Sequence, residues 1–251
     1  MAGHSHWAGI KYQKAAVDAR RGKLFSKLVR RIITAARTGG GSPETNLELR
    51  YAMVEARAAN MPKDNIERAI KKGTGELAGA DFVEVFYEGY APGGVAVMVQ
   101  ALTDNRNRTV SEIRKLFELR GGNLGTAGCV AWMFERKGLL LIEAEEVDED
   151  ELLTVVLEAG ADDLRASGDI YEITCAVGEF AGVREAVEKA GYRLQLAEVS
   201  YMSSQTVALD QAGARPVLKL LSELQDHDDV QHVYSNFEVA DEVLAALEVE
   251  L

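Results

Sequence analysis

Helical spacing of apolar and polar positions dominates the first 75 residues. Between residues 15 and 37, apolar side chains recur every three or four positions and form one face of a helix, while lysines and arginines form the opposite face. The stretch TGGGSP at 38–43 ends this helix, because glycine suits a C-cap and proline discourages continuation. A second helix is expected at about Asn46–Ala59 and a third near Pro62. Three helices with short loops predict a small bundle.

Beyond residue 80 the pattern becomes extended. The stretches at 82–90 and 94–104 predict strands, and 108–122 has the spacing of an amphipathic helix that ends on two glycines. The apolar run GCVAWMF at 128–134 predicts another strand. From residue 137 to residue 202 the order is strand, helix, strand, strand, helix, strand, provided that DDLRAS at 162–167 is extended. This order is that of a ferredoxin-like split βαβ unit.

The pattern as a whole predicts an α+β protein in which an N-terminal three-helix bundle precedes two ferredoxin-like α+β domains, one inserted in the other. The expected parts are 1–78 for the bundle, 79–135 with 205–251 for the middle domain, and 136–204 for the inserted domain. A single long α/β sheet is the alternative, but the elements are too irregularly spaced for it.

Composition places the chain among ordinary globular proteins of the cytoplasm. Its 251 residues are 47% hydrophobic and 27% charged, which is enough for a real core, and its apolar runs are too short to span a membrane. The N-terminus lacks the apolar segment of a secretory signal. Cys129 and Cys175 are far apart and outside any CxxC motif, so two reduced, buried thiols are expected.

Charge is divided unevenly along the chain. Residues 1–75 hold 15 lysines and arginines against 6 acidic residues, whereas the remaining 176 residues hold 13 against 34. A net charge of -12 therefore conceals a basic module joined to an acidic body. Because the body repels polyanions, nucleic acid is expected to meet the basic module first, leaving the acidic domains for protein partners.

Four stretches resemble the most distinctive parts of the YebC/PmpR family, in the same order and from one end of the chain to the other. They are AGHSHWAGIKYQKAAVDARRGKLFSKL, NMPKDNIERAIKKGTGE, YEGYAPGGVAVMVQALTDNRNRT and GGNLGTAGCVAWMF. The resemblance implies three domains, the last inserted in the middle one, and gene regulation without catalysis. Most of that family is described as probable DNA-binding transcriptional regulators, while its mitochondrial members are translational activators of a cytochrome oxidase subunit.

The first loop departs from that family's pattern. His6 stands where lysine is usual, Gly9 where asparagine is common, and Tyr12 with Gln13 where a more basic pair is expected. The loop is therefore less cationic than in typical relatives, which weakens the case for phosphate contacts at residues 6–13.

The cationic face of the first helix is the main candidate for phosphate binding. It is expected to be solvated and held apart from the acidic body, with Trp7 and Tyr12 nearby as stacking groups. The candidate residues are Lys11, Lys14, Arg20, Lys23, Lys27, Arg30 and Arg31. No paired helix-turn-helix with a clear recognition helix is evident, so strong sequence specificity is not expected.

A second candidate lies in TDNRNRT at 103–109, between a strand and a helix. Free N–H groups at a helix N-terminus favour anions, and Arg106 and Arg108 add positive charge. The alternative is ordinary capping, in which Asn107 or Thr109 closes the helix and the arginines pair with carboxylates. The sequence leaves both interpretations open.

Nothing in the sequence predicts catalysis or a cofactor. The glycine-rich stretch at 121–130 lacks the Lys-Ser/Thr ending of a P-loop, and the histidines lack a complete metal-ligand set. The first hypothesis is a non-enzymatic regulator that binds DNA, with structured RNA at the ribosome as the alternative target. A protein-interaction scaffold, whose basic bundle docks on its own acidic domains, is the second alternative.

Overall fold

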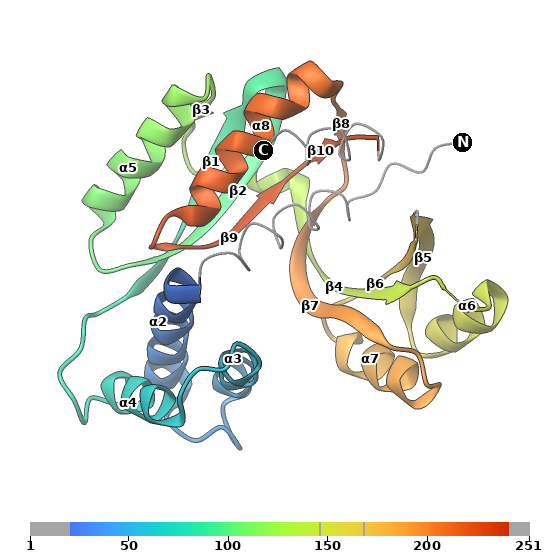
Figure 1. The fold of residues 1–251 in the computed structure, drawn as a ribbon, viewed down its shortest axis with the longest axis horizontal. Coiled ribbons are helices and arrows are strands. Elements are labelled where there is room, and N and C mark those ends of the chain that lie inside the picture. Colours follow the sequence, from blue (N-terminus) through green and yellow to red (C-terminus); the bar gives the residue numbers. More distant parts are fainter. Residues whose placement is uncertain (1–20, 146, 168, 241–251) are drawn as a thin grey trace.

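The computed structural model describes residues 21–145, 147–167 and 169–240. Three parts lie around a common centre: a helical bundle and two four-stranded sheets, each with two helices (Figure 1). The fold is thus α+β, with N-terminal helices followed by two sheet-containing domains, as predicted. None of the described helices combines the length and the apolar character needed to cross a membrane.

The bundle contains α2 (Arg21–Gly39), α3 (Leu47–Ala58) and α4 (Lys63–Gly73). Their apolar faces enclose a separate core that includes Leu28, Ile32, Ile33, Leu49 and Ile66. Asn46 caps α3, because its Oδ1 accepts a hydrogen bond from the Leu49 N–H at 3.1 Å. At Gly73 the helices approach so closely that a Cβ would lie 2.5 Å from the Ile33 carbonyl oxygen, which explains the glycine.

The first sheet contains β1 (Val83–Ala91), β2 (Val95–Thr103), β3 (Asn123–Leu124) and β9 (Val230–Ser235) in the antiparallel order β3-β1-β2-β9. Helices α5 (Arg106–Leu119) and α8 (Gln211–Asp226) contribute Phe117 and Leu218 to the core on one face of this sheet. The short 3-10 turn η1 (Pro92–Gly94) joins β1 to β2, while β8 (Val207–Ala208) and β10 (Phe237–Glu238) form a separate parallel pair.

The second sheet follows the predicted order of elements. It contains β4 (Phe134–Glu143), β5 (Ala161–Ser167), β6 (Ile170–Cys175) and β7 (Leu194–Ser203), with α6 (Glu149–Glu158) after β4 and α7 (Phe180–Lys189) after β6. The antiparallel spatial order β5-β6-β4-β7 is that of a ferredoxin-like fold. The DDLRAS stretch is indeed a strand, within β5.

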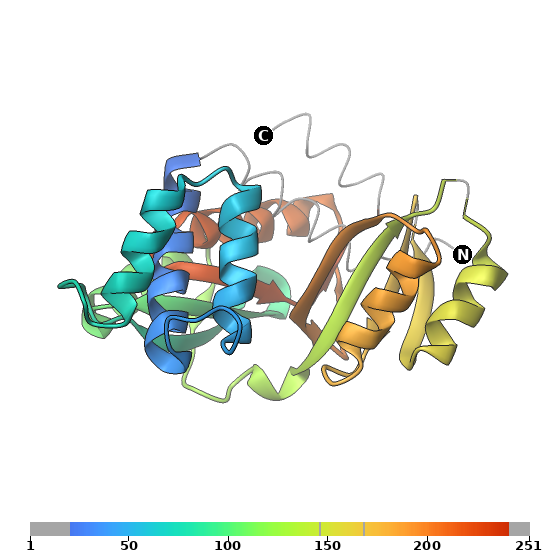
Figure 2. The same ribbon diagram turned by 90° about the horizontal axis from the view of Figure 1, so that it is seen from below.

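The second sheet is inserted, in chain order, into the part of the molecule that contains the first sheet. Its strands lie in the chain between β3 and β8, so the chain passes twice between the two sheets (Figure 1, Figure 2). The first sheet has the same layering of one sheet and two helices, but its first two strands, β1 and β2, are joined by a short turn and pair directly, whereas α6 separates β4 from β5. Strand β3 lies at the edge of the first sheet and precedes the inserted part in the chain. The bundle, by contrast, connects to the first sheet through residues 74–82 alone.

The predicted strand at 128–134 is wrong. Ala131–Met133 form the 3-10 turn η2, and only Phe134 belongs to a strand. The carboxylate of Glu88 accepts hydrogen bonds from the N–H groups of Gly128, Val130 and Ala131 at 2.7–2.8 Å. These N–H groups therefore need no partner strand. Burial alone would raise the pKa of Glu88, but the three hydrogen bonds lower it overall.

Candidate nucleic-acid interface

The nine candidate cations fall into three groups. Lys11, Lys14 and Arg20 lie outside the described residues. The next four lie on α2, and they are Lys23, Lys27, Arg30 and Arg31. Arg106 and Arg108 lie in the first turn of α5.

The cationic face of α2 packs against the C-terminal end of α8, so the expectation that it is held apart from the acidic body is wrong, and of its four cations only Lys23 is exposed. The Lys23 Nζ donates to the Asp226 carbonyl at 2.9 Å, and the Lys27 Nζ donates to the Gln225 carbonyl. Arg30 donates to the Asp228 carbonyl. Carbonyl groups at a helix C-terminus carry partial negative charge, which attracts cations. We call these contacts the α2–α8 contact.

The α2–α8 contact buries Lys27, which is only 8% exposed. Burial, followed by the positive charge of Lys23, lowers the pKa of Lys27 to about 8. Arg31 binds within the bundle instead, where its Nη1 lies 2.6 Å from the Glu55 Oε2. The main interpretation of the charge pattern was that the acidic body repels nucleic acid, whereas docking of the basic bundle on the acidic domains was expected only in the second alternative.

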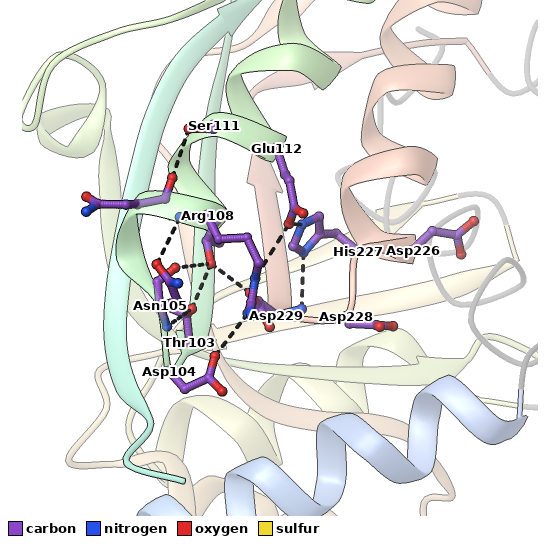
Figure 3. Close-up of polar contacts among 12 residues, drawn as sticks. Thr103, Asp104, Asn105, Arg108, Ser111, Glu112, Asp226, His227, Asp228 and Asp229 are labelled. Carbon is purple, nitrogen blue, oxygen red and sulfur yellow. Dashed lines mark hydrogen bonds and ion pairs between the residues drawn. The ribbon is translucent and has the colours of Figure 1, made fainter.

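Asp229 joins the two candidate sites predicted from the sequence. Its side chain is 2% exposed and lies 3.2 Å from Arg30 Nη1 and 2.7 Å from Arg108 Nη2. Figure 3 shows Arg108 beside Asp229. The Thr109 hydroxyl donates to the same carboxylate at 2.7 Å. Burial alone would raise the pKa of Asp229, but the hydrogen bonds from Arg108 and Thr109 and the charge of Arg30 lower it overall. Arg30 and Arg108, predicted as separate phosphate contacts, thus share one buried carboxylate.

The first turn of α5 is capped by Asn105, not by Asn107 or Thr109, which the capping alternative had named. The Asn105 Oδ1 accepts from the Arg108 N–H at 3.1 Å. Arg108 also lies 3.0 Å from Asp104, so the predicted pairing of an arginine with a neighbouring carboxylate is present. Arg106 is exposed. The contacts of this turn favour capping over a phosphate site at Arg108.

Glu112, His227 and Asp229 bring three potential metal ligands within 4.8 Å of one another. Their hydrogen bonds account for this cluster without an ion. His227 Nδ1 accepts from the Asp229 N–H at 3.1 Å, so Nε2 of the neutral ring carries the hydrogen and donates to Glu112 at 2.9 Å. A metal on Nε2 would move the ring hydrogen to Nδ1, directly opposite that N–H group.

Helix α4 carries a basic face that was not predicted as a site from the sequence. Arg68, Lys71 and Lys72 have i, i+3, i+4 spacing, which places them on one side of the helix. Arg68 and Lys71 are exposed, and Lys72 is half-buried. Among the ion pairs between described residues, α4 contributes only Lys63 with Glu67. The helical spacing is visible in the sequence, but lysines at this position are equally typical of an ordinary helix C-terminus. We call these three residues the α4 basic face.

Models of two protein domains match the chain. The model described as "TACO1/YebC protein N-terminal domain" matches residues 5–76, and the model described as "TACO1/YebC second and third domain" matches residues 82–237. Together they span the bundle and both sheets.

Full-length relatives are similar to the chain over almost its whole length. A protein of Dictyoglomus turgidum named "Probable transcriptional regulatory protein" is 54% identical over 98% of this chain and 100% of its own. One of the same name from Aquifex aeolicus is 54% identical over 97% of this chain and 98% of its own. A crystal structure of a conserved hypothetical protein from Aquifex aeolicus matches with a TM-score of 0.82 and 54% identity, covering 96% of this chain and 99% of that one. The chain therefore belongs to the TACO1/YebC family, in which these relatives are named as probable transcriptional regulatory proteins.

Proposed function

We propose that this protein is a non-enzymatic, cytoplasmic regulator of gene expression that binds nucleic acid, with DNA as the first candidate target. The observation that carries the proposal is the basic bundle, with 15 basic and 6 acidic residues in the first 75, on an otherwise acidic chain. Phosphate backbones are bound mainly through such cationic surfaces. The relatives' name, transcriptional regulatory protein, supports DNA as the target.

The α4 basic face is the part of the described bundle best suited to phosphate contact. Arg68, Lys71 and Lys72 form no ion pairs with carboxylates among the described residues. The cations of α2 instead donate hydrogen bonds to carbonyls at the C-terminal end of α8. The proposal therefore moves the first point of contact from α2 to α4.

The α2–α8 contact supports a second candidate function, that of a protein-interaction scaffold. In that case the basic bundle serves mainly to hold the acidic domains in place, and their exposed surfaces recruit proteins. A scaffold has no reason to bind polyphosphate in a salt-dependent way.

Salt titration of the full-length chain separates these functions. We expect binding to duplex DNA or to a ribosomal RNA fragment to weaken as salt rises, with a log–log slope of about -0.9 per phosphate contact on duplex DNA. Absence of binding to both at low salt would contradict the proposal and leave the scaffold.

Crosslinking in cells, followed by sequencing of the attached DNA and RNA, then identifies the target. Recovery of promoter DNA alone supports transcriptional control. Recovery of ribosomal RNA alone contradicts DNA as the target and supports a translation factor.

A further inference from the structure

A cleft of about 890 Å³ lies where the three parts of the molecule meet. Its lining comes mainly from α2 and α3 of the bundle, from β7 of the second sheet and from β9 of the first sheet. Small-molecule and cofactor sites occupy a similar range of volumes, about 300–1,000 Å³. A double helix, whose major groove alone is about 12 Å wide, is far too large to enter a cleft of this size.

Three side chains that can donate hydrogen bonds line this cleft. Lys27, Arg31 and Gln231 all line it. Gln231 is 9% exposed, and within the described part of the chain its Nε2 has no hydrogen-bond partner. An unpaired buried amide costs free energy, so an acceptor supplied by a ligand would relieve this cost. Lys27 donates to a backbone carbonyl, which leaves its positive charge without a directly bound carboxylate among the described residues.

Two rings on β9 lie beside these donors. His232 and Tyr234 are two positions apart in the strand and therefore point to the same face of the sheet. Their ring centroids are 6.0 Å apart and their planes are 16° from parallel. The Tyr234 hydroxyl donates to Gln100 at 3.0 Å, and the ring meets that of Tyr201 edge-on at 5.1 Å. These contacts fix the orientation of Tyr234.

His232 is neutral at physiological pH. Burial, with the nearby charges of Arg31 and Lys27, lowers its pKa to about 3. A neutral ring beside two cations offers a stacking surface without adding a third charge. Proteins that bind single-stranded RNA commonly stack bases on aromatic and histidine rings of a sheet and hold the phosphates with basic side chains.

Carboxylates also line the cleft, and two of them lie close to Arg31 or Tyr234. Glu55 pairs with Arg31, and Glu188 lies 2.9 Å from Arg184. The negative charge of Glu198 helps to raise the pKa of the Tyr234 hydroxyl. The positive charges of Lys27 and Arg31, by contrast, lie near His232 and help to lower its pKa. The lining is therefore mixed in charge, which suits a ligand with one anionic group and one polar ring better than a ligand that is anionic throughout.

We infer that the cleft binds one nucleotide unit of a single-stranded nucleic acid. Lys27, Arg31 and the free amide of Gln231 hold the phosphate, and the base stacks on His232 and Tyr234. This inference rests on the proposed function and gives it a second contact point besides the α4 basic face. The cleft selects unpaired strands, because a base inside a duplex cannot reach the rings.

The test measures the affinity of the full-length protein for a fluorescein-labelled oligouridine by fluorescence anisotropy. The Gln231→Leu/His232→Ala variant removes the amide and one ring, and we expect its affinity to fall at least about tenfold. Gln205→Leu makes the same glutamine-to-leucine change at an exposed position outside the cleft lining and is expected to bind like the unaltered protein. Equal affinity of the cleft variant and the unaltered protein would overturn the inference.

A second measurement does not depend on a variant that folds. Oligouridine containing 4-thiouridine is crosslinked to the unaltered protein, and the attached peptides are mapped. Crosslinks within residues 225–237 or on β7 support the cleft, and crosslinks confined to α4 overturn it. If duplex DNA binds but oligouridine does not, the cleft inference fails and the proposed function stands. If neither binds at low salt, both fail.

Discussion

Helices α2 and α4 lie in the same bundle and both carry a basic face, but the two faces have different surroundings. The cations of α2 contact carbonyls at the end of α8 and the buried Asp229, whereas the α4 basic face makes no ion pair with a described carboxylate. The comparison shows that a basic stripe becomes a binding surface only where the fold leaves it exposed. For α2 the neighbour is a helix C-terminus whose contacting residues follow about 200 positions later in the chain.

This difference predicts that changes around α2 alter the stability of the fold, whereas changes on α4 alter binding. Asp229 receives both Arg30 and Arg108 in a buried position. Asp229→Ala leaves these two arginines without their carboxylate, and we expect the free energy of unfolding to fall by about 3–5 kcal/mol. Urea denaturation measures this change.

Asp228 provides the matched control for that prediction. Its side chain is exposed, and Arg30 contacts its backbone carbonyl, which alanine retains. Asp228→Ala should change the free energy of unfolding by less than about 0.5 kcal/mol. Similar decreases in the two variants would show that Asp229 does not anchor α2.

Replacing Lys23, Lys27, Arg30 and Arg31 together by glutamine should release the bundle from α8. The sequence alone predicts that this variant keeps its fold and loses only affinity for nucleic acid. The observed contacts predict a decrease of roughly 2–4 kcal/mol in the free energy of unfolding, since the variant cannot form the hydrogen bonds of these charged groups. Limited proteolysis should also cut the 74–82 connection faster than in the unaltered protein. Unchanged proteolysis would mean that the α2–α8 contact does not hold the bundle.

The pH dependence of stability should show the neutral His232. Its pKa is about 3 in the folded protein and near 6.5 in the unfolded chain, so the unfolded state binds more protons between these values. Stability is therefore complete above pH 6.5 and falls as pH decreases, by at most about 1.4 kcal/mol per pH unit. Urea midpoints between pH 6.5 and 5 should fall less steeply in His232→Phe. Parallel curves for the two proteins would contradict this assignment.

The smallest effect on stability is expected for Arg68→Gln/Lys71→Gln/Lys72→Gln. These side chains make none of the contacts that hold α2, so the free energy of unfolding should change by less than about 0.5 kcal/mol. The salt dependence of duplex binding should become shallower by about 0.9 for each phosphate that the variant no longer neutralises. Lys63→Gln, which removes a cation already paired with Glu67 on the same helix, serves as the control. An unchanged salt slope would remove α4 from the interface.

Periodicity was sufficient to predict the three helices of the bundle and the elements of the second sheet, because the apolar spacing within each segment identifies it even where its partner is distant in sequence, as Phe134 of β4 is from Ser203 of β7. The predicted strand at 128–134 failed because Glu88, 40 residues earlier, satisfies its N–H groups. The free surface predicted for α2 failed for a similar reason, since Asp226 and Asp229 approach it from about 200 residues away. Spacing within one segment contains no information about such distant partners.

The candidate cations illustrate the same limit. Residue type and spacing identified Arg30 and Arg108 as charged groups of interest, but not that both contact one carboxylate. The α4 basic face and the rings of β9 were visible as residues, while their exposure and their position beside the cleft depend on how the three parts are assembled.

The bundle and the inserted sheet are joined to the first sheet by different numbers of chain connections, so they differ in how freely they can change orientation. The inserted sheet is tethered by two chain passages, so its orientation is restricted even when surface charges are screened. The bundle has a single tether, and polar contacts with α8 and Asp229 hold its docked position. Raising the ionic strength should consequently weaken these contacts and let the bundle change its orientation, while the inserted sheet stays in place.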